Sequence, residues 1–377
     1  MTSSVPQPAA DDGPDPAAPA AGRAKKAPPV AVKYLILGFF PLAMVVSLVG
    51  IMLSGMHKPV PHDIPVAVVA STAPQAEQAA QGLEKALGDS FDIRPLASTD
   101  RARTLVHDRD LAGAYVLPKD GARQALLYTA GGAGIGQQMA VEQTFTQLAA
   151  QQQIELETED LAPLHSHDSM GLVALYMGLG YSMAGFLVVT VMSVAAPELM
   201  RLRKFLPVLA GWASFMSVCI WLLTGPVIGA VHGHAWPIIG LGAAMIFAVS
   251  LVTTVFARFL GPLALIPVVT LTMFLGVPSS NGGMSTYMVP GFFHTLHGVL
   301  PLPANVESVR AVLYFGGDGV SGHLATLGVW AGAALLLNVV IELFKHRRSG
   351  DKNLEAIDHM FDAEHVHEIP DAVRTAN

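Results

Sequence analysis

The hydrophobic residues of this chain are gathered into long apolar runs, which one extended and more polar block separates. Runs of about twenty apolar residues, enough to cross the hydrocarbon of a bilayer, occur before residue 57 and again after residue 169. Residues 57–169 are less hydrophobic and carry most of the acidic side chains. This pattern predicts an α-helical polytopic membrane protein with one water-exposed domain.

The apolar runs predict six transmembrane helices. The first, Tyr34–Met56, could instead be the core of a signal peptide, because basic residues precede it. Against this alternative, the run exceeds the roughly 7–15 apolar residues of signal peptides, and no small-residue cleavage site follows it. An uncleaved span is therefore favoured. The other spans are predicted at Met170–Ala196, Phe205–Val231, Trp236–Ala257, Leu263–Gly276 and Leu324–Phe344.

The fifth predicted span is the least regular. Arg258 is the only charged residue in about forty apolar residues, and about twenty suffice for one crossing. We therefore place a tight turn at Arg258–Pro262. The span that follows, Leu263–Gly276, is short and contains Pro267, and its start could lie as early as Phe259.

Six spans place both termini in the cytoplasm, and the basic clusters agree with this orientation. Lys and Arg are enriched in short cytoplasmic loops of membrane proteins. Residues 1–33 and 345–377 are then cytoplasmic tails, and disorder is expected for residues 1–33 and for most of residues 349–377, which are polar. The expected location is the cell membrane, in a multi-pass arrangement. The basic residues on the predicted cytoplasmic side are Arg23, Lys25, Lys26, Lys33, Arg201, Arg203, Lys204, Arg258, Lys345, Arg347 and Arg348.

The polar block, residues 57–169, alternates β-type and helix-type segments. This alternation predicts a small extracytoplasmic α/β domain between the first and second spans. Its strands are continuous apolar runs, as expected for a sheet that is covered on both faces. Strands are predicted at Ile64–Ala70, Phe91–Leu96, Leu111–Leu117 and Gln124–Thr129, and helices at Pro74–Leu87, Thr99–His107 and Gln137–Gln153.

The glycine-rich turn GGAGIG, residues 131–136, follows a predicted strand and precedes a helix. A dinucleotide-binding turn would need the pattern G-x-G-x-x-G, but Gln137 stands where the last glycine is required. No Gly-Lys-Ser/Thr sequence follows, so the turn is not a phosphate-binding P-loop. The favoured interpretation is a flexible connection.

The segment 277–323, between the fifth and sixth predicted spans, is broken by prolines and glycines. Two short pieces, Gly291–Leu300 and Ala304–Phe315, have helix-like sequences. Segments of this kind lie at the membrane surface or enter the membrane partway. The predicted topology places the segment outside, where protein or water can satisfy its broken backbone.

Composition agrees with a membrane protein and disfavours several other classes. Of the 377 residues, 52% are hydrophobic and 14% are charged, whereas about a quarter is charged in average soluble domains. The mean hydropathy is +0.47. Cys219 is the single cysteine, so no internal disulfide is expected. No catalytic constellation stands out, and we expect no enzyme activity, no cofactor and no nucleic-acid partner.

The predicted spans contain almost no ionisable residues, which disfavours a proton- or sodium-coupled carrier. Asn338 in the sixth span is a candidate for an interhelical hydrogen bond. Two charge pairs are expected from helical spacing. They are Glu198 with Arg201 at the cytoplasmic surface, and Glu307 with Arg310 in the outer segment.

The histidines offer candidate metal or pH-responsive positions, but ordinary polar roles are favoured. His165-Ser166-His167-Asp168 could bind a metal, although a polar joint between the outer domain and the second span explains it better. A pH-responsive role is conceivable because histidine titrates near neutrality. Ordinary polar positions are likewise favoured for His232, His234, His359, His365 and His367.

Three stretches carry a resemblance to a known superfamily. They are DIPVAVVAS (Asp63–Ser71), DLAGAYVLPKD (Asp110–Asp120), and a late stretch from LGVPSSNGG to AVLYFGG (Leu275–Gly317). With one span, an outer domain and five further spans, the chain resembles the type-2 permease superfamily of ABC exporters. It is most similar to phage-infection-protein-like (YhgE/Pip-like) actinobacterial membrane proteins. The likeness covers roughly residues 34–345.

The resemblance implies a membrane subunit of an exporter of amphiphilic or peptide-like substrates. It also implies a homodimer or heterodimer in the lipid bilayer. Because the chain contains no ATPase motif, the ATPase would be a separate subunit. Unlike many exporter permeases, the region before the first span is Pro-rich rather than an amphipathic helix. The alternative is a membrane-anchored interaction protein that binds cell-envelope or secreted partners without transport.

The resemblance and the predicted topology together select two sets of site residues. The outer segment would form short re-entrant helices that cap the translocation path. The loop 197–207 would be the docking site of the ATPase. The candidate outer gate comprises Pro278, Asn281, Gly282, Gly283, Pro290, Phe292, Phe293, Glu307 and Arg310, and the candidate docking loop comprises Glu198, Arg201, Arg203 and Lys204.

Overall fold

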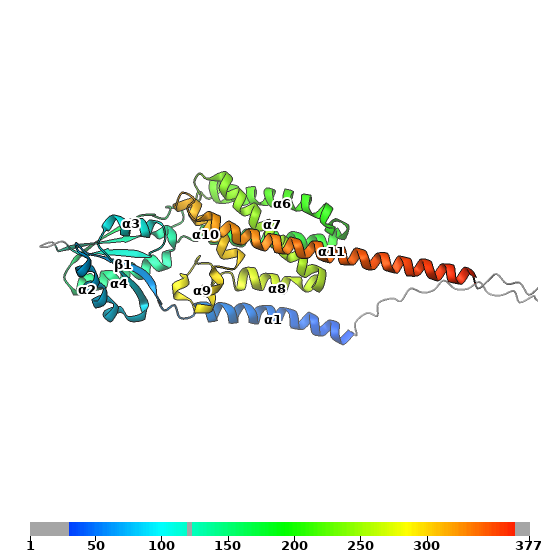
Figure 1. Cartoon of the computed structure of the whole chain (residues 1–377), viewed down its shortest axis with the longest axis horizontal. Coiled ribbons are helices and arrows are strands. Elements are labelled where there is room, and N and C mark those ends of the chain that lie inside the picture. The colour runs from blue at the N-terminus through cyan, green and yellow to red at the C-terminus, as the bar shows by residue number, and fades with distance from the viewer. Residues whose placement is uncertain (1–29, 119–122, 366–377) are drawn as a thin grey trace, which may run out of the picture. The chain divides into compact units, whose positions relative to one another are not determined.

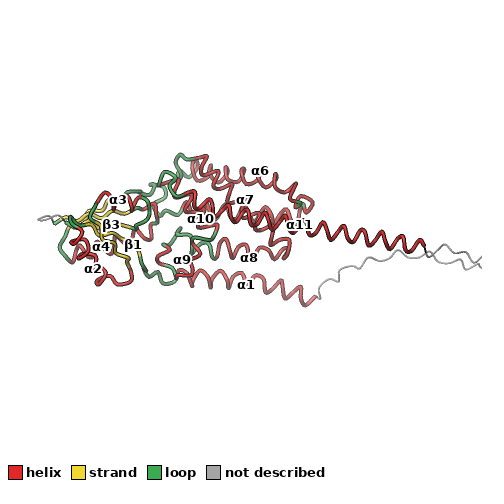
Figure 2. The backbone as a smooth tube through the Cα atoms, in the orientation of Figure 1, coloured by secondary structure: helices red, strands yellow, loops and turns green. Residues whose placement is uncertain are grey.

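The computed structural model describes residues 30–118 and 123–365, which are mostly helical and include one small mixed sheet (Figures 1 and 2). The chain divides into two units, Met1–Val45 and Val46–Asn377. Residues 1–29 of the predicted N-terminal tail and the last residues, 366–377, lie outside the described residues, whereas residues 30–33, also predicted to be disordered, are the start of helix α1. The sheet and all the elements discussed below, apart from the first part of α1, belong to the second unit.

The sheet confirms the predicted α/β domain and adds one strand to it. Its order is β2-β1-β3-β4-β5. β1 is parallel to both β2 and β3, β3 is antiparallel to β4, and β4 is parallel to β5. The strands are β1 (Ile64–Val69), β2 (Phe91–Leu96), β3 (Gly113–Val116), β4 (Gln124–Thr129) and β5 (Glu155–Asp160).

β5 is not predicted by the sequence pattern, because its sequence, ELETED, has no apolar run. Most of its residues are exposed or half-buried, as expected for a strand at the edge of a sheet. Pairing with β4 therefore places this acidic segment in the sheet. Strand propensity alone could not have predicted it, because Glu and Asp are depleted in strands.

Helices cover both faces of the sheet, as the apolar strands predicted. α2 (Ala73–Leu87) and α4 (Ile135–Gln151) pack with Val66 and Val68 on one face. α3 (Thr99–His107) packs with Ala67 and Val69 on the other. Figure 1 shows α3 on one side of β1, with α2 and α4 on the opposite side. All six residues of β1 are buried, so this strand is the centre of the domain core.

Four helices of the described chain are long and apolar enough to cross a membrane. They match the second, third, fourth and sixth predicted spans. The segments are α5 (Val173–Ala195), Leu202–Val227, α7 (Ala235–Leu260) and the apolar part of α11, Val320–Phe344. The second of these consists of α6 (Leu202–Leu222) and a π-helical turn, Leu223–Val227, which contains Pro226.

The first and fifth predicted spans are not among these four helices of the described chain. α1 (Val30–Met56) has 27 residues, but the apolar part in which side chains are described is Pro41–Met56. The fifth span is a broken helix, formed by η5 (Gly261–Ala264), α8 (Leu265–Val269) and a π-helical turn, η6 (Thr270–Phe274). Pro267 lacks a backbone donor, which contributes to the break. Among the residues whose side chains are described, length and composition therefore identify four of the six predicted spans.

The last helix is longer than the sequence pattern predicts. α11 runs from Val320 to His365, whereas the predicted sixth span ends at Phe344. The expectation of a disordered tail is corrected for residues 349–365, which are helical. The first proline after Phe344 is Pro370, so no helix-breaking residue interrupts this stretch.

The broken outer segment is a packed part of the structure. η7 (Thr286–Met288), α9 (Gly291–His297) and α10 (Pro301–Tyr314) follow one another, close to the predicted helical pieces. Every residue of α10 from Pro301 to Val312 is buried. α10 contacts α5, α7 and α11, and it also touches η2 (Gly131–Ala133) of the α/β domain. It therefore connects the domain to the helices.

Candidate functional site

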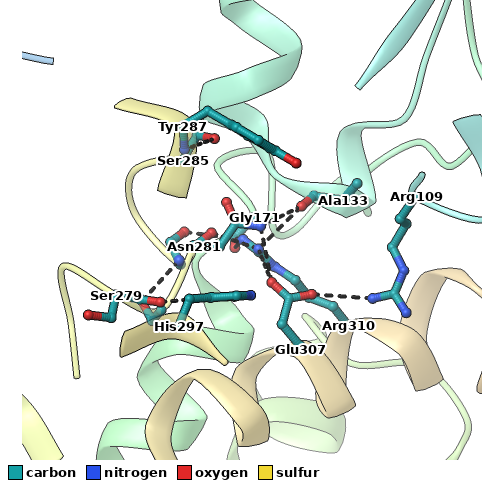
Figure 3. Close-up of polar contacts among 12 residues, drawn as sticks. Arg109, Ala133, Gly171, Ser279, Asn281, Ser285, Tyr287, His297, Glu307 and Arg310 are labelled. Carbon is teal, nitrogen blue, oxygen red and sulfur yellow. Dashed lines mark hydrogen bonds and ion pairs between the residues drawn. The ribbon is translucent and has the colours of Figure 1, made fainter. Parts of the chain in front are cut away.

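The centre of the site is the carboxylate of Glu307, which α10 places between the α/β domain and the long helices. Glu307 is only 5% exposed. Its Oε1 accepts a hydrogen bond from Asn281 Nδ2 at 3.0 Å, and its Oε2 accepts one from Arg109 Nη1 at 3.2 Å. Figure 3 shows these side chains converging from α10, from the segment before α9 and from the α/β domain.

Arg310 lies one helical turn beyond Glu307 and is 2% exposed. Its Nη1 is 3.6 Å from Glu307 Oε1, which confirms the predicted pair. The same nitrogen donates to the backbone oxygen of Asn281 at 2.6 Å, and Nη2 donates to that of Gly282 at 3.2 Å. Longer contacts of 3.5 Å reach the carbonyl oxygens of Ala133 and Gly171. One guanidinium thus joins α10 to three other segments.

Two of the residues that contact Glu307 have a left-handed backbone conformation, which residues other than glycine rarely adopt. Arg109 has φ 69° and Asn281 has φ 56°. Arg109 Nη2 also donates to the carbonyl oxygen of Asp318 at 2.8 Å, and its guanidinium lies 4.9 Å from the centre of the Phe315 ring. Strained backbones of this kind persist only where surrounding contacts hold them. The polar contacts with Glu307 supply part of that constraint.

The glycine-rich turn before α4 is buried against this site, which corrects the expectation of a flexible connection. Gly131, Gly132 and Ala133 are all buried. A Cβ on Gly132 would lie 2.6 Å from Cβ of Tyr314, so only glycine allows α10 to approach this closely. The carbonyl oxygen of Ala133 accepts from Asn281 Nδ2 at 3.0 Å. The turn therefore packs against the outer segment.

The charges around Glu307 favour its ionised form. Burial tends to raise the pKa of Glu307, but Arg310, His297, the Asn281 amide and Arg109 together lower it below the ordinary value. An ionised buried carboxylate needs such partners, because an unpaired charge in a protein interior is strongly unfavourable. The site is therefore a compensated ionic cluster.

A second carboxylate, Asp168, lies nearby and forms the predicted polar joint. Its Oδ1 accepts from the backbone N–H of Leu172 at 2.8 Å and caps the start of α5. Tyr314 of α10 donates to Asp168 Oδ2 at 3.4 Å. Burial raises the pKa of Asp168 despite the opposing effect of its hydrogen bonds. Burial, followed by the charge of Asp168, raises the pKa of Tyr314 to about 12.

The histidines at this joint stack on one another. The ring centres of His165 and His232 are 4.1 Å apart, and that of His167 is 6.0 Å from His165. No group of three metal-ligating side chains suited to a metal ion occurs in the searched part of the chain. His234, the other histidine of the α6–α7 turn, has an exposed side chain. The tail residues His359, His365 and His367 lie outside the described side chains.

Only part of the predicted outer gate comes together. Asn281, Gly282, Glu307 and Arg310 form the cluster described above. Pro278 and Phe293 are buried elsewhere, where both flank Gly55 near the end of α1. The remaining predicted gate residues, Gly283, Pro290 and Phe292, are exposed.

Arg109 and Ala133 belong to the site but are not predicted from the sequence. Arg109 is an isolated basic residue after a helix, and Ala133 contributes only a backbone oxygen. No sequence pattern marks either residue, because their partners lie about 150 to 200 positions away, at Asn281 and Glu307. The sequence also gives no indication that Arg109 has a left-handed backbone conformation.

The predicted docking loop lies at the start of α6. Pro197–Met200 forms a single turn of 3₁₀ helix, and the four predicted docking residues are all exposed. The expected ion pair between Glu198 and Arg201 does not form, although both residues are described. The four docking residues are Glu198, Arg201, Arg203 and Lys204.

Arg258 holds this loop against α11. Its Nη2 donates to the carbonyl oxygen of Met200 at 3.3 Å and lies 3.2 Å from Glu342 Oε2. Its Nη1 donates to the carbonyl oxygen of Asn338 at 2.8 Å. Asn338 Nδ2 in turn donates to Leu251 O of α7 at 3.0 Å, which confirms the predicted interhelical hydrogen bond. The contacts of Arg258 therefore fix the backbone of the loop at Met200 relative to α11.

These observations define a class: a mainly helical protein with several helices apolar enough for a membrane, and a small mixed α/β domain joined to them by a buried ionic cluster. No protein-family model, curated protein or solved structure matches the chain. Function is therefore inferred from the geometry of the chain itself.

Proposed function

We propose that the protein is the membrane subunit of an exporter of the type-2 ABC permease class, which moves amphiphilic or peptide-like substrates. The observation that carries this proposal is the burial of α10 between the α/β domain and three long helices. A buried helix that contacts both parts can transmit movement from one to the other, because packed interfaces switch between discrete arrangements.

The proposal includes six spans with both termini in the cytoplasm. α7 ends near Arg258, which contacts Glu342 far along α11. Just before α11 begins at Val320, the carbonyl oxygen of Asp318 accepts from Arg109 of the α/β domain, so this end of α11 lies at the end of the bundle that bears the domain. The chain between Leu260 and Asn281 must connect these two ends, which supports a fifth crossing. α1, with 27 residues, is about 40 Å long and sufficient for the first crossing.

In this proposal the cluster around Glu307 closes the outer end of the path. Arg109 and Asn281 donate hydrogen bonds to the two oxygens of the Glu307 carboxylate. Movement of either residue would therefore change the contacts that hold α10 in place. The spans of a homodimer or heterodimer would line the path. Asn281, Gly282, Glu307 and Arg310 are the gate residues that the geometry supports.

A separate ATPase would bind the loop at Pro197–Lys204. Three exposed cations, Arg201, Arg203 and Lys204, give this loop a positive surface suited to an acidic groove on a partner. The contacts of Arg258 hold its backbone in place. Such preorganisation lowers the entropic cost of docking.

The test is a crosslinked pull-down of the full chain from its native membrane, analysed for an ATPase. We expect an ATPase with the wild-type chain and a loss of at least about tenfold with Arg201→Ala/Arg203→Ala/Lys204→Ala. Arg101→Ala, which removes an exposed arginine of α3, is the matched control. An unchanged ATPase yield in the triple variant would exclude this loop as the docking site. Recovery of secreted or envelope proteins, with no ATPase, would favour the membrane-anchored interaction protein.

A further inference from the structure

The α/β domain contains a crevice that none of the contacts described so far uses. It has a volume of about 300 Å³. Ala70 and Ser71, directly after β1, form one wall, and Leu117 and Pro118, directly after β3, form another. Gln75, Gln78 and Ala79 of α2 complete the lining.

The order of the strands explains why a crevice forms here. After β1 the chain turns through α2 to β2, on one side, whereas after β3 it continues to β4, on the other side. The two connections therefore leave the carboxyl ends of β1 and β3 in opposite directions and open a gap between them. In open α/β sheets, ligands bind in the crevice at this topological switch point. The cavity and the topology are independent observations, and they select the same place.

The lining residues define the chemistry of a suitable ligand. None of these seven residues is charged, so the described lining of the crevice offers no side-chain partner for an ionic group. The amides of Gln75 and Gln78 and the hydroxyl of Ser71 can each donate and accept hydrogen bonds. None of the hydrogen bonds formed within the described chain uses these three side chains. Leu117 and Pro118 add an apolar wall.

We infer that the crevice between the ends of β1 and β3 binds a neutral, hydroxyl-rich ligand, namely a saccharide unit. A sugar ring pairs an apolar C–H face with hydroxyl groups that both donate and accept, which matches the mixed lining. Sites of this kind use a few placed polar groups against an apolar wall. The inference goes beyond the proposed transport function, and it holds or fails whether or not an ATPase partner exists.

The test measures binding of named saccharides to the full chain in nanodiscs by saturation-transfer NMR. The probes are diacetylchitobiose, maltose and trehalose, with inorganic phosphate and tetra-alanine representing the other ligand classes. We expect saturation transfer to the ring protons of at least one saccharide. Gln75→Ala/Gln78→Ala should weaken its binding by about tenfold or more, because two hydrogen-bonding side chains are lost. Ser71→Phe should abolish binding by filling the mouth of the crevice.

Gln81→Ala is the matched control, because Gln81 is an exposed glutamine of the same helix that does not line the crevice. It should bind as the wild type does, and thermal unfolding of all variants shows whether the domain remains folded. Absence of binding by all three saccharides would overturn the inference. So would equal binding by the wild type and both crevice variants. Binding of phosphate or tetra-alanine alone, with the same sensitivity to the variants, would assign the crevice to another ligand class.

Discussion

At the residue scale, the chemistry of the site depends on one carboxylate and the groups that keep it ionised. Glu307 has only limited access to water, and it forms ion pairs with Arg310 and Arg109. Removing one partner of a buried pair is costly because the other charge remains uncompensated. An exposed pair such as Arg103 with Glu159, 2.7 Å apart, is screened by water and contributes little.

Glu307 should therefore make the stability of the protein dependent on pH. Its pKa is lower in the folded protein than the ordinary value of 4.5, so folding favours the ionised form. This stabilisation is fully present above about pH 5 and is lost as the pH falls below 4.5 through the folded-state pKa. Glu307→Gln should lower stability at pH 7 by about 3 kcal/mol and should flatten the acid limb of the profile.

The measurement is denaturant unfolding of the detergent-solubilised protein between pH 3 and pH 7 for the wild type and each variant. Glu159→Gln removes a carboxylate of the same type from a surface pair and serves as the control, with an expected change below about 1 kcal/mol. Equal effects of the two substitutions on the free energy of unfolding would show that burial of the Glu307 ion pairs does not increase their contribution to stability.

At the scale of elements, the close approach of α10 to the turn at Gly131–Ala133 joins the domain to the helices. The carbonyl oxygen of Ala133 accepts a hydrogen bond from the Asn281 side chain, and Gly132 leaves space for the side chain of Tyr314. The turn therefore acts through the backbone oxygen of Ala133 and through the absence of a side chain at Gly132. α3 contributes from the same domain, because Arg109 follows its C-terminal end and reaches Glu307.

Substitution of a single glycine tests this packing. Gly132→Ala would place a Cβ 2.6 Å from Cβ of Tyr314 and should destabilise the protein by about 1–3 kcal/mol. Gly82→Ala is the control, because Gly82 lies inside α2 with nothing within 4 Å of a new Cβ. It should stabilise the protein by about 0.5–1 kcal/mol. Thermal unfolding reports both changes, and a neutral Gly132→Ala would contradict the close packing of α10.

At the scale of the whole molecule, two groups of contacts within the second unit mark the two ends of the helical bundle. His232, in the α6–α7 turn, stacks with His165 next to the α/β domain. Arg258 and Glu342 mark the other end, where the docking loop is held. The proposed transporter would transmit ATPase movement from this second end to the cluster around Glu307 through the helices that connect them.

Cysteine labelling in intact cells tests the proposed six spans. In a Cys219→Ser background, Gln81→Cys and Phe292→Cys should react with a membrane-impermeant maleimide. Lys204→Cys and Phe259→Cys should react only after permeabilisation. All four positions are exposed, so burial in the protein does not hide them. If Phe259→Cys and Phe292→Cys react from the same side, the broken segment does not cross, and the six-span arrangement is wrong.

Sequence alone determined the elements whose signals are local. Continuous apolar runs predicted six spans, of which four are long apolar helices in the described chain, and they also predicted the buried strand β1, because burial of apolar surface requires such runs. Spacing within one helix predicted the pair of Glu307 and Arg310, since residues three apart share a helix face. Four of the nine predicted gate residues belong to the cluster.

Tertiary structure decided everything that depends on distant partners. The acidic strand β5 exists because β4 pairs with it, and Arg109 belongs to the site because it meets a carboxylate from another part of the chain. The crevice at β1 and β3 follows from strand order, which no local pattern encodes. A sequence records which groups a chain carries, but long-range packing selects which of them meet, because each contact is fixed by all the others around it.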